Sequence, residues 1–181
     1  MEKYARLADI LKRGKKMFQS VSEDIIKKAL VTYVAKNTRY LGKAEIDKKD
    51  DTVVLRGEFS INESCYLSPG SGHFNAVEAI MCFNQMLYAA LLGGIEKKMF
   101  PFYDDITADE FNLHRRKVYI LEFEKIKFKK QINNNCFEGV LELKPLHVVK
   151  DKIYVNCQFG FGNDEECKSF AGNIKVFIPV L

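Results

Sequence analysis

Apolar residues recur along this chain with two different periods. From Ser22 they follow at intervals of three and four up to Tyr33, which predicts an amphipathic helix capped by Ser22. Beyond it most segments alternate apolar and polar residues, which predicts strands at 39–47, 52–61, 117–131, 137–144, 153–161 and 170–178. The alternation slips between Phe123 and Ile126, and we interpret this slip as a β-bulge.

The stretch 74–94 follows neither pattern, because it is apolar almost all round. A turn containing Pro69 and Gly70 precedes it, and the double glycine at 93–94 predicts the end of a helix. Its length is that of a membrane span. However, the charged Glu78 and two amide side chains interrupt it, and such groups are costly in lipid. We therefore interpret it as the buried core helix of a protein that is not embedded in a membrane.

These elements predict an α+β protein with a single hot-dog domain. A sheet of about six strands can bury one face only by wrapping around something apolar, and the helix at about 74–94 is the object long enough. We assign residues 21–181 to this hot-dog domain and residues 1–20 to a basic N-terminal helical extension. A lone protomer of this architecture leaves a sheet edge exposed, so we expect a homodimer or a higher homo-oligomer.

Composition and charge narrow the function classes. The formal net charge is +4, and residues 1–28 alone account for it, so no basic stripe runs through the fold and we expect no nucleic-acid binding. The N-terminus carries charges throughout and has no apolar core of a secretory signal. The cysteines are odd in number and form no C-x-x-C pair, which indicates free thiols in the cytoplasm rather than a disulfide framework or a zinc site. They are Cys65, Cys82, Cys136, Cys157 and Cys167.

Three motifs carry a family resemblance. They lie at 59–66 (FSINESCY), 72–78 (GHFNAVE) and 82–85 (CFNQ), with Tyr33 and the segment 39–41 (RYL) on their N-terminal side. Together they resemble the FcoT-like hot-dog proteins, and the strand layout agrees to the C-terminus. This resemblance implies activity on fatty acyl thioesters, either as a long-chain acyl-CoA thioesterase or as a (2E)-enoyl-acyl carrier protein glycyltransferase of isonitrile lipopeptide pathways.

The resemblance also implies where the substrate lies. By matching position, this resemblance implies an acyl-thioester site lined by Tyr33, Tyr66, Asn75 and Asn84, beside His73 and Glu78. Asn84 lies roughly opposite Asn75 around the helix. Both side chains can therefore meet one ligand only if the site spans a dimer interface or bends over the helix.

The N-terminal end of a buried helix offers oriented N–H groups to the oxygen of a thioester carbonyl. We expect the amides of residues 75–77 and the side chain of Asn75 to act in this way, with Tyr66 donating a further hydrogen bond. His73 is a candidate proton shuttle, and Glu78 either orients it or is itself the base. An alternative needs no catalysis, because Asn75-x-x-Glu78 is also a capping-box pattern.

Other candidates are weaker. Arg39 lies in a family-like motif and is the candidate partner of the glycine carboxylate, although the pattern favours an ordinary exposed strand arginine. His114 and His147 have no metal-ligand spacing, and we treat them as structural. We expect no metal and no cofactor beyond the phosphopantetheine of acyl carrier protein or coenzyme A that carries the substrate.

Four functions remain open at this point. The first is glycine addition to a (2E)-enoyl-ACP with hydrolytic release, and the second is plain acyl-CoA or acyl-ACP hydrolysis. The third is dehydration of a 3-hydroxyacyl-ACP, which His73 followed by the helical Glu78 also suggests, although dehydratases take these residues from separate segments. The fourth is a non-catalytic acyl-binding hot-dog protein.

Overall fold

The computed structural model describes residues 18–67, 70, 72–149, 152–163 and 167–181. The strands are β1 (Gln19–Ser20), β2 (Leu41–Lys49), β3 (Thr52–Phe59), β4 (Tyr119–Phe128), β5 (Phe137–Val149), β6 (Lys152–Gly162) and β7 (Phe170–Pro179). The α-helices are α2 (Glu23–Ala29), α3 (Ala76–Glu96) and α4 (Ala108–Leu113), and three short 3-10 helices are η1 (Val31–Lys36), η2 (Pro101–Tyr103) and η3 (Arg115–Lys117).

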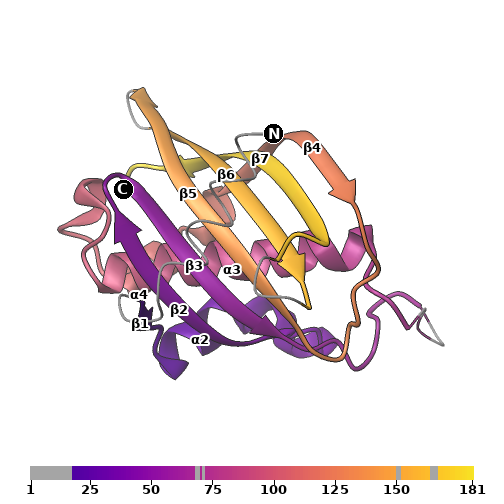
Figure 1. The fold of residues 1–181 in the computed structure, drawn as a ribbon. Helices are drawn as coiled ribbons and strands as arrows, with labels where there is room; N and C mark the ends of the chain where they lie inside the picture. The colour runs from indigo at the N-terminus through magenta and orange to yellow at the C-terminus, as the bar shows by residue number, and fades with distance from the viewer. Residues whose placement is uncertain (1–17, 68–69, 71, 150–151, 164–166) are drawn as a thin grey trace.

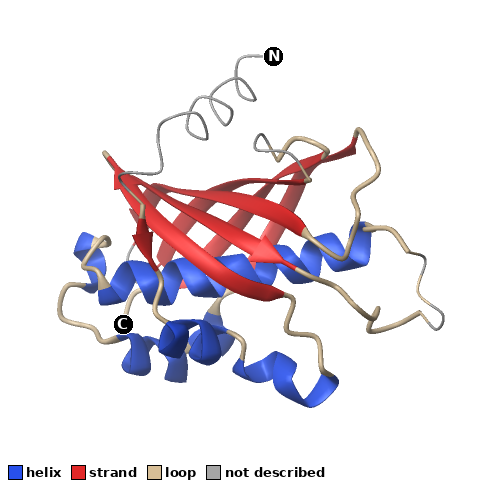
Figure 2. Cartoon of the chain, turned by 60° about the horizontal axis from the view of Figure 1, so that its bottom comes forward, coloured by secondary structure: helices blue, strands red, loops and turns tan. Residues whose placement is uncertain are grey.

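One antiparallel sheet with the strand order β1-β2-β3-β5-β6-β7-β4 forms the body of the molecule. The sheet curves over α3, which runs beneath its concave face, and the shorter helices lie on the other side of α3 (Figures 1 and 2). A sheet wrapped around one long helix is the hot-dog arrangement, so the α+β fold predicted from the sequence is confirmed.

The core lies between the concave face of the sheet and α3. Two thirds of the residues of α3 are buried, so its hydrophobic character serves packing rather than insertion into a membrane, although its length and hydropathy fit a span. Near the start of α3, the ring of Phe74 packs on Phe137, Phe161 and Phe170, with ring centroids 4.8, 5.2 and 6.0 Å away. These tilted and edge-on contacts fix the chain where it enters the helix.

The end of the central helix differs from its prediction. Gly93 and Gly94 are buried inside α3, which continues to Glu96. A Cβ on Gly94 would come within 2.3 Å of the Phe100 ring, whereas a Cβ on Gly93 would meet the Val21 methyls at 3.4 Å. The double glycine therefore serves close packing against neighbouring side chains rather than terminating the helix.

Local signals elsewhere predict the structure well. Ser22 caps α2 by accepting a hydrogen bond from the amide of Ile25. The bulge expected in the 117–131 strand is present, because the register of β4 against β7 shifts between Phe123 and Lys125 and again nearer its start. The predicted helical extension lies mostly outside the described residues; at its end, Gln19 and Ser20 are not helical but form β1 against β2.

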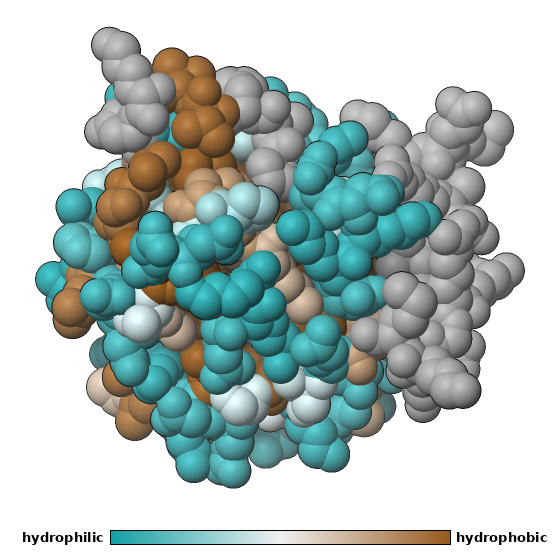
Figure 3. Space-filling model, turned by 90° about the vertical axis from the view of Figure 1, so that its left-hand side faces the viewer, coloured by the Kyte–Doolittle hydropathy of each residue, from teal (hydrophilic) through white to brown (hydrophobic). Residues whose placement is uncertain are grey.

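The two edges of the sheet differ. At one edge the two-residue β1 and α2 lie against β2 (Figure 1). At the other, ten-residue β4 pairs only with β7 and exposes large apolar side chains that are 37 to 55% accessible. They are Tyr119, Leu121, Phe123, Ile126 and Phe128. By contrast, the end of the molecule at the left of Figure 1 is mostly hydrophilic, with hydrophobic surface gathered towards its top (Figure 3).

Candidate active site

The N-terminus of α3 is held by a complete capping box. Asn75 Oδ1 accepts hydrogen bonds from the amides of Val77 (3.0 Å) and Glu78 (3.3 Å), and Glu78 Oε2 accepts one from the amide of Asn75 (3.3 Å). The capping alternative predicted from the sequence is therefore present. Because two amides point at Oδ1, the orientation of the Asn75 amide is fixed, and its Nδ2 lies on the opposite side.

This cap changes which groups can stabilise an oxyanion. Of the amides expected to serve, those of Asn75 and Val77 are already occupied by the capping box. Ala76 occupies the first helical position, where an amide has no partner within the helix. In addition, Asn75 Nδ2 is buried and makes no hydrogen bond of regular geometry, and the Tyr66 hydroxyl is its neighbour. The helix end thus presents one backbone donor and one unsatisfied side-chain donor next to each other in the chain.

Glu78 is a buried carboxylate surrounded by weakly acidic groups. It is 1% exposed. Partial desolvation and, after it, the Glu78 charge raise the pKa of the half-exposed Tyr66 hydroxyl, and a hydrogen bond with the Asn75 side chain opposes this rise. Burial and, after it, the Glu78 charge raise the pKa of the Cys82 thiol. Burial, Cys65 and Glu78 raise the pKa of Tyr40 in the same way. Each of these groups therefore stays protonated at neutral pH and can act as a hydrogen-bond donor.

His73 differs from this carboxylate in its exposure to solvent. Its side chain is exposed and lines an open groove of about 440 Å³ with Phe74, Phe128 and residues 129–131. The Glu78 carboxylate, in contrast, is bonded to the Asn75 amide. His73 is therefore exposed in this groove and Glu78 is buried at the helix start, and their roles as proton shuttle and orienting partner stay a prediction.

Tyr33 and Asn84 line a second cavity, of about 390 Å³, together with Tyr88 and Arg116. Burial is the main cause that raises the pKa of Tyr33, to about 12. Asn84 follows Asn75 by nine residues in α3, which places the two about 13 Å apart along the helix axis. The predicted site residues thus form two groups, one at the start of α3 and one at its middle.

Two residues that the sequence did not mark as important support this region. The first is Arg115, whose buried guanidinium donates to the carbonyls of Lys28 and Ala29 at the end of α2 and lies 4.2 Å above the ring of Tyr88. A cation at a helix C-terminus is favourable because the last carbonyls are otherwise unpaired. Arg115 therefore holds α2 against α3.

The second is Gln85, which is fully buried on α3. Its Oε1 accepts from the amides of Tyr40 and Leu41, both at 2.9 Å, and its Nε2 donates to the carbonyl of Thr38 at 2.7 Å. Gln85 therefore fixes the backbone that leads into β2. It belongs to the 82–85 motif, so its position was visible in the sequence while its role was not.

The remaining candidates lie elsewhere. Arg39 is exposed on the segment that Gln85 fixes, and it does not line the cavity of Tyr33 and Asn84. His114 is the C-cap residue of α4, and the backbone of His147 lies in β5. Within the described part of the chain, no three His, Cys, Asp or Glu side chains gather as a metal-binding set.

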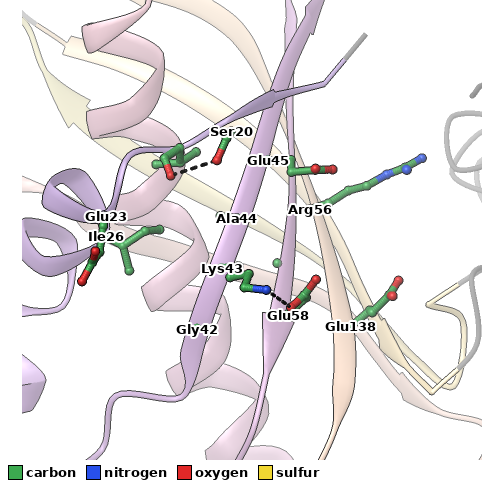
Figure 4. Close-up of a pocket in the computed structure, with 12 residues that line it drawn as sticks. Ser20, Glu23, Ile26, Gly42, Lys43, Ala44, Glu45, Arg56, Glu58 and Glu138 are labelled. Atoms are coloured by element: carbon green, nitrogen blue, oxygen red, sulfur yellow. Dashed lines mark hydrogen bonds and ion pairs between the residues drawn. The ribbon is translucent and has the colours of Figure 1, made fainter. Parts of the chain in front are cut away.

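A third cavity, of about 610 Å³, lies away from all of these groups. It opens beside α2 and the outer side of β2 and β3, where Glu45, Glu58 and Glu138 project from neighbouring strands (Figure 4). Lys43 forms an ion pair with Glu58 at 3.9 Å, and Arg56 stacks on the ring of Phe18 at 4.3 Å. Its charged, open lining does not suit an acyl chain.

A sheet wrapped around one buried helix defines the hot-dog class of folds. The FcoT-like thioesterase domain matches residues 28–178, and the chain belongs to this family. It is 30% identical over 160 residues to a (2E)-enoyl-ACP glycyltransferase of Mycobacterium marinum, covering 87% of this chain and 86% of that one. It is 27% identical over 122 residues to an enzyme of the same name from Streptomyces coeruleorubidus, covering 67% of this chain and 73% of that one.

Solved structures with a similar fold include thioesterases. One, a hypothetical thioesterase of Streptococcus pneumoniae with coenzyme A, is 10% identical with a TM-score of 0.44 and covers 83% of this chain and 95% of its own. Another, a thioesterase of Pseudomonas aeruginosa, is 8% identical with a TM-score of 0.45 and covers 89% of this chain and 96% of its own.

Proposed function

We propose that this protein adds glycine to a (2E)-enoyl thioester carried on the phosphopantetheine of acyl carrier protein or coenzyme A, and then hydrolyses the thioester. The relatives named above support the reaction, and one observation supports its location. This is the buried Asn75 Nδ2, a donor without an acceptor of regular geometry, beside the Tyr66 hydroxyl at the positive end of a 21-residue helix. The free thiols of the described cysteines are consistent with a reducing cytoplasm.

In this mechanism the thioester oxygen accepts from Asn75 Nδ2 and the Ala76 amide. The glycine amine attacks C3, the C2–C3 π electrons move towards the carbonyl, and the two donors stabilise the negative charge that forms on the oxygen. Glu78 removes the proton that the ammonium group loses and returns it to C2. The Tyr66 hydroxyl, protonated at neutral pH, is a further donor to the substrate.

The helix cap allows catalysis to be tested separately from folding. Asn75→Asp keeps an oxygen for capping but removes the Nδ2 donor, and Glu78→Gln keeps the capping-box acceptor but removes the base. We expect each to lower kcat by about 10²–10³-fold, as for a lost oxyanion donor, while the melting temperature stays close to that of the wild type. Wild-type rates in both variants would assign these residues to capping alone.

Intact-mass spectrometry of a medium-chain (2E)-enoyl carrier protein tests the reaction itself. We expect a mass gain of one glycine, or release of the glycyl acid, only when glycine is present. Loss of the acyl group without glycine would instead establish the second candidate function, acyl thioester hydrolysis, which the family description and the same oxyanion donors favour. Addition of water would indicate a dehydratase, and an unchanged mass would indicate an acyl-binding protein.

We also propose that β4 pairs with β4 of a second copy in a homodimer. Apolar side chains such as Phe123 and Phe128 are about half exposed along this open edge, and pairing would bury them. A dimer would also allow the Asn75 group of one protomer and the Asn84 group of its partner to share one substrate. Sedimentation equilibrium should give twice the 20.8 kDa chain mass, and Phe123→Glu should give monomers; a monomeric wild type would contradict the proposal.

A further inference from the structure

The cavity of Tyr33 and Asn84 has an unbalanced charge. Two arginines, Arg115 and Arg116, are among its lining residues, and none of the described lining residues is acidic. The walls are otherwise tyrosine rings, aliphatic side chains and neutral polar groups. A concave site of this kind attracts a ligand that carries negative charge.

The two arginines are not equivalent. The guanidinium of Arg115 is buried, and its hydrogen bonds go to neutral acceptors: the carbonyls of Lys28 and Ala29, the Asn112 side chain and the Thr32 hydroxyl. Its donors are therefore used, yet no carboxylate neutralises its charge in these contacts. That charge reaches the cavity, because it partly offsets the rise in the Tyr33 pKa caused by burial.

Arg116 differs from Arg115 in both its exposure and the use of its donors. It is exposed at the cavity, and its side chain takes part in no hydrogen bond or ion pair with any residue that the structure describes. A guanidinium with free donors binds an oxyacid group through two parallel hydrogen bonds. The protonated Tyr33 hydroxyl and the Asn84 amide add neutral donors to the same cavity.

We infer that Arg116 binds an anionic oxyacid group of the substrate at this cavity, while Arg115 supplies a fixed positive charge behind it. The inference rests on the proposed function for the identity of the ligand, which is either the carboxylate of glycine or the phosphate of the phosphopantetheine arm. This inference gives the role of anion partner to Arg116, which lies outside the family-like motifs. The sequence alone offers Arg39 as the candidate for that role.

Steady-state kinetics of Arg116→Gln distinguish the two sources. For the carboxylate, we expect KM for glycine to rise about tenfold or more with KM for the enoyl thioester unchanged, and glycinamide to be used equally by wild type and variant. For the phosphate, KM for the phosphopantetheine thioester rises instead, and the difference disappears with a pantetheine thioester that lacks the phosphate. Lys117→Ala, which removes an exposed neighbouring cation outside the cavity, is the matched control.

A binding measurement keeps this inference separate from the proposed reaction. Inorganic phosphate, titrated by calorimetry into the full chain, should bind the wild type and Lys117→Ala with equal affinity and bind Arg116→Gln at least about tenfold more weakly. This result would support the anion site even if no glycine were transferred. Equal or undetectable phosphate binding in all three proteins, or kinetic effects in Arg39→Ala rather than in Arg116→Gln, would overturn it.

Discussion

Replacing Gln85 by leucine tests how much of the fold depends on one buried amide. Leucine has a similar volume, but it leaves the amides of Tyr40 and Leu41 and the carbonyl of Thr38 without partners in the protein interior. Each buried unsatisfied group costs about 1–3 kcal/mol, and partial relaxation of the segment brings the expected loss to about 4 kcal/mol. For a chain of this size, that loss lowers the melting temperature by about 8–16 °C.

Differential scanning calorimetry measures this loss, with Gln158→Leu as the matched control. Gln158 is a half-buried glutamine on β6, and we expect its replacement to change stability by less than about 1 kcal/mol. A Gln85→Leu variant that melts no lower than the Gln158→Leu variant would refute the reasoning, because the three hydrogen bonds would then be dispensable.

Gln85→Glu adds a pH-dependent check on the same contacts. A carboxylate can accept from both amides but cannot donate to the carbonyl of Thr38, whereas a protonated carboxyl can do both. Burial and this carbonyl favour the neutral acid, so the pKa of the new side chain is raised in the folded state. The variant should therefore be most stable below about pH 4, the ordinary pKa of glutamate, and should lose stability as the pH rises.

Two further predictions concern packing and ionisation. Gly94→Ala should lower the free energy of unfolding in urea by about 1–3 kcal/mol, because its Cβ would overlap the Phe100 ring. Gly93→Ala should stay within about 1 kcal/mol of the wild type, since its gain in helix propensity offsets a mild contact with Val21. Equal losses of stability in the two variants would contradict this account. Burial raises the pKa of Tyr33 to about 12, so the stability that this hydroxyl contributes is present below about pH 10 and is lost as the pH rises through 12. Tyr33→Phe should therefore show a smaller loss of stability at alkaline pH than the wild type. An equal loss in the two proteins would contradict the raised pKa.

Much of the fold could be predicted because its signals are local. The cap at Ser22, the bulge in β4 and the strand periods depend on residues within a few positions of one another. The end of α3 could not be predicted in the same way. Gly94 is explained by Phe100, which lies after the helix end and meets it only once the chain has turned back.

The candidate site likewise combines a local feature that the sequence predicts with long-range features that it does not. The capping box between Asn75 and Glu78 is a pattern of four residues, and the sequence contains it in full. In contrast, the groove that His73 lines with residues 128–131 and the entry of Arg116 into the cavity of Tyr33 depend on how distant segments pack. Sequence spacing cannot express such distances, so the only arginine it offered as a candidate was Arg39, which lies inside the recognisable motif.

The unequal edges of the sheet limit how far copies of this protein can join. Strand pairing from edge to edge is the usual route to open-ended assemblies. Here β1 and α2 lie against one edge, while β4 leaves the other accessible. In a dimer joined through β4, as proposed above, the free edge at each end would be the two-residue β1, which offers little backbone for another copy to pair with, so such pairing would stop at two copies.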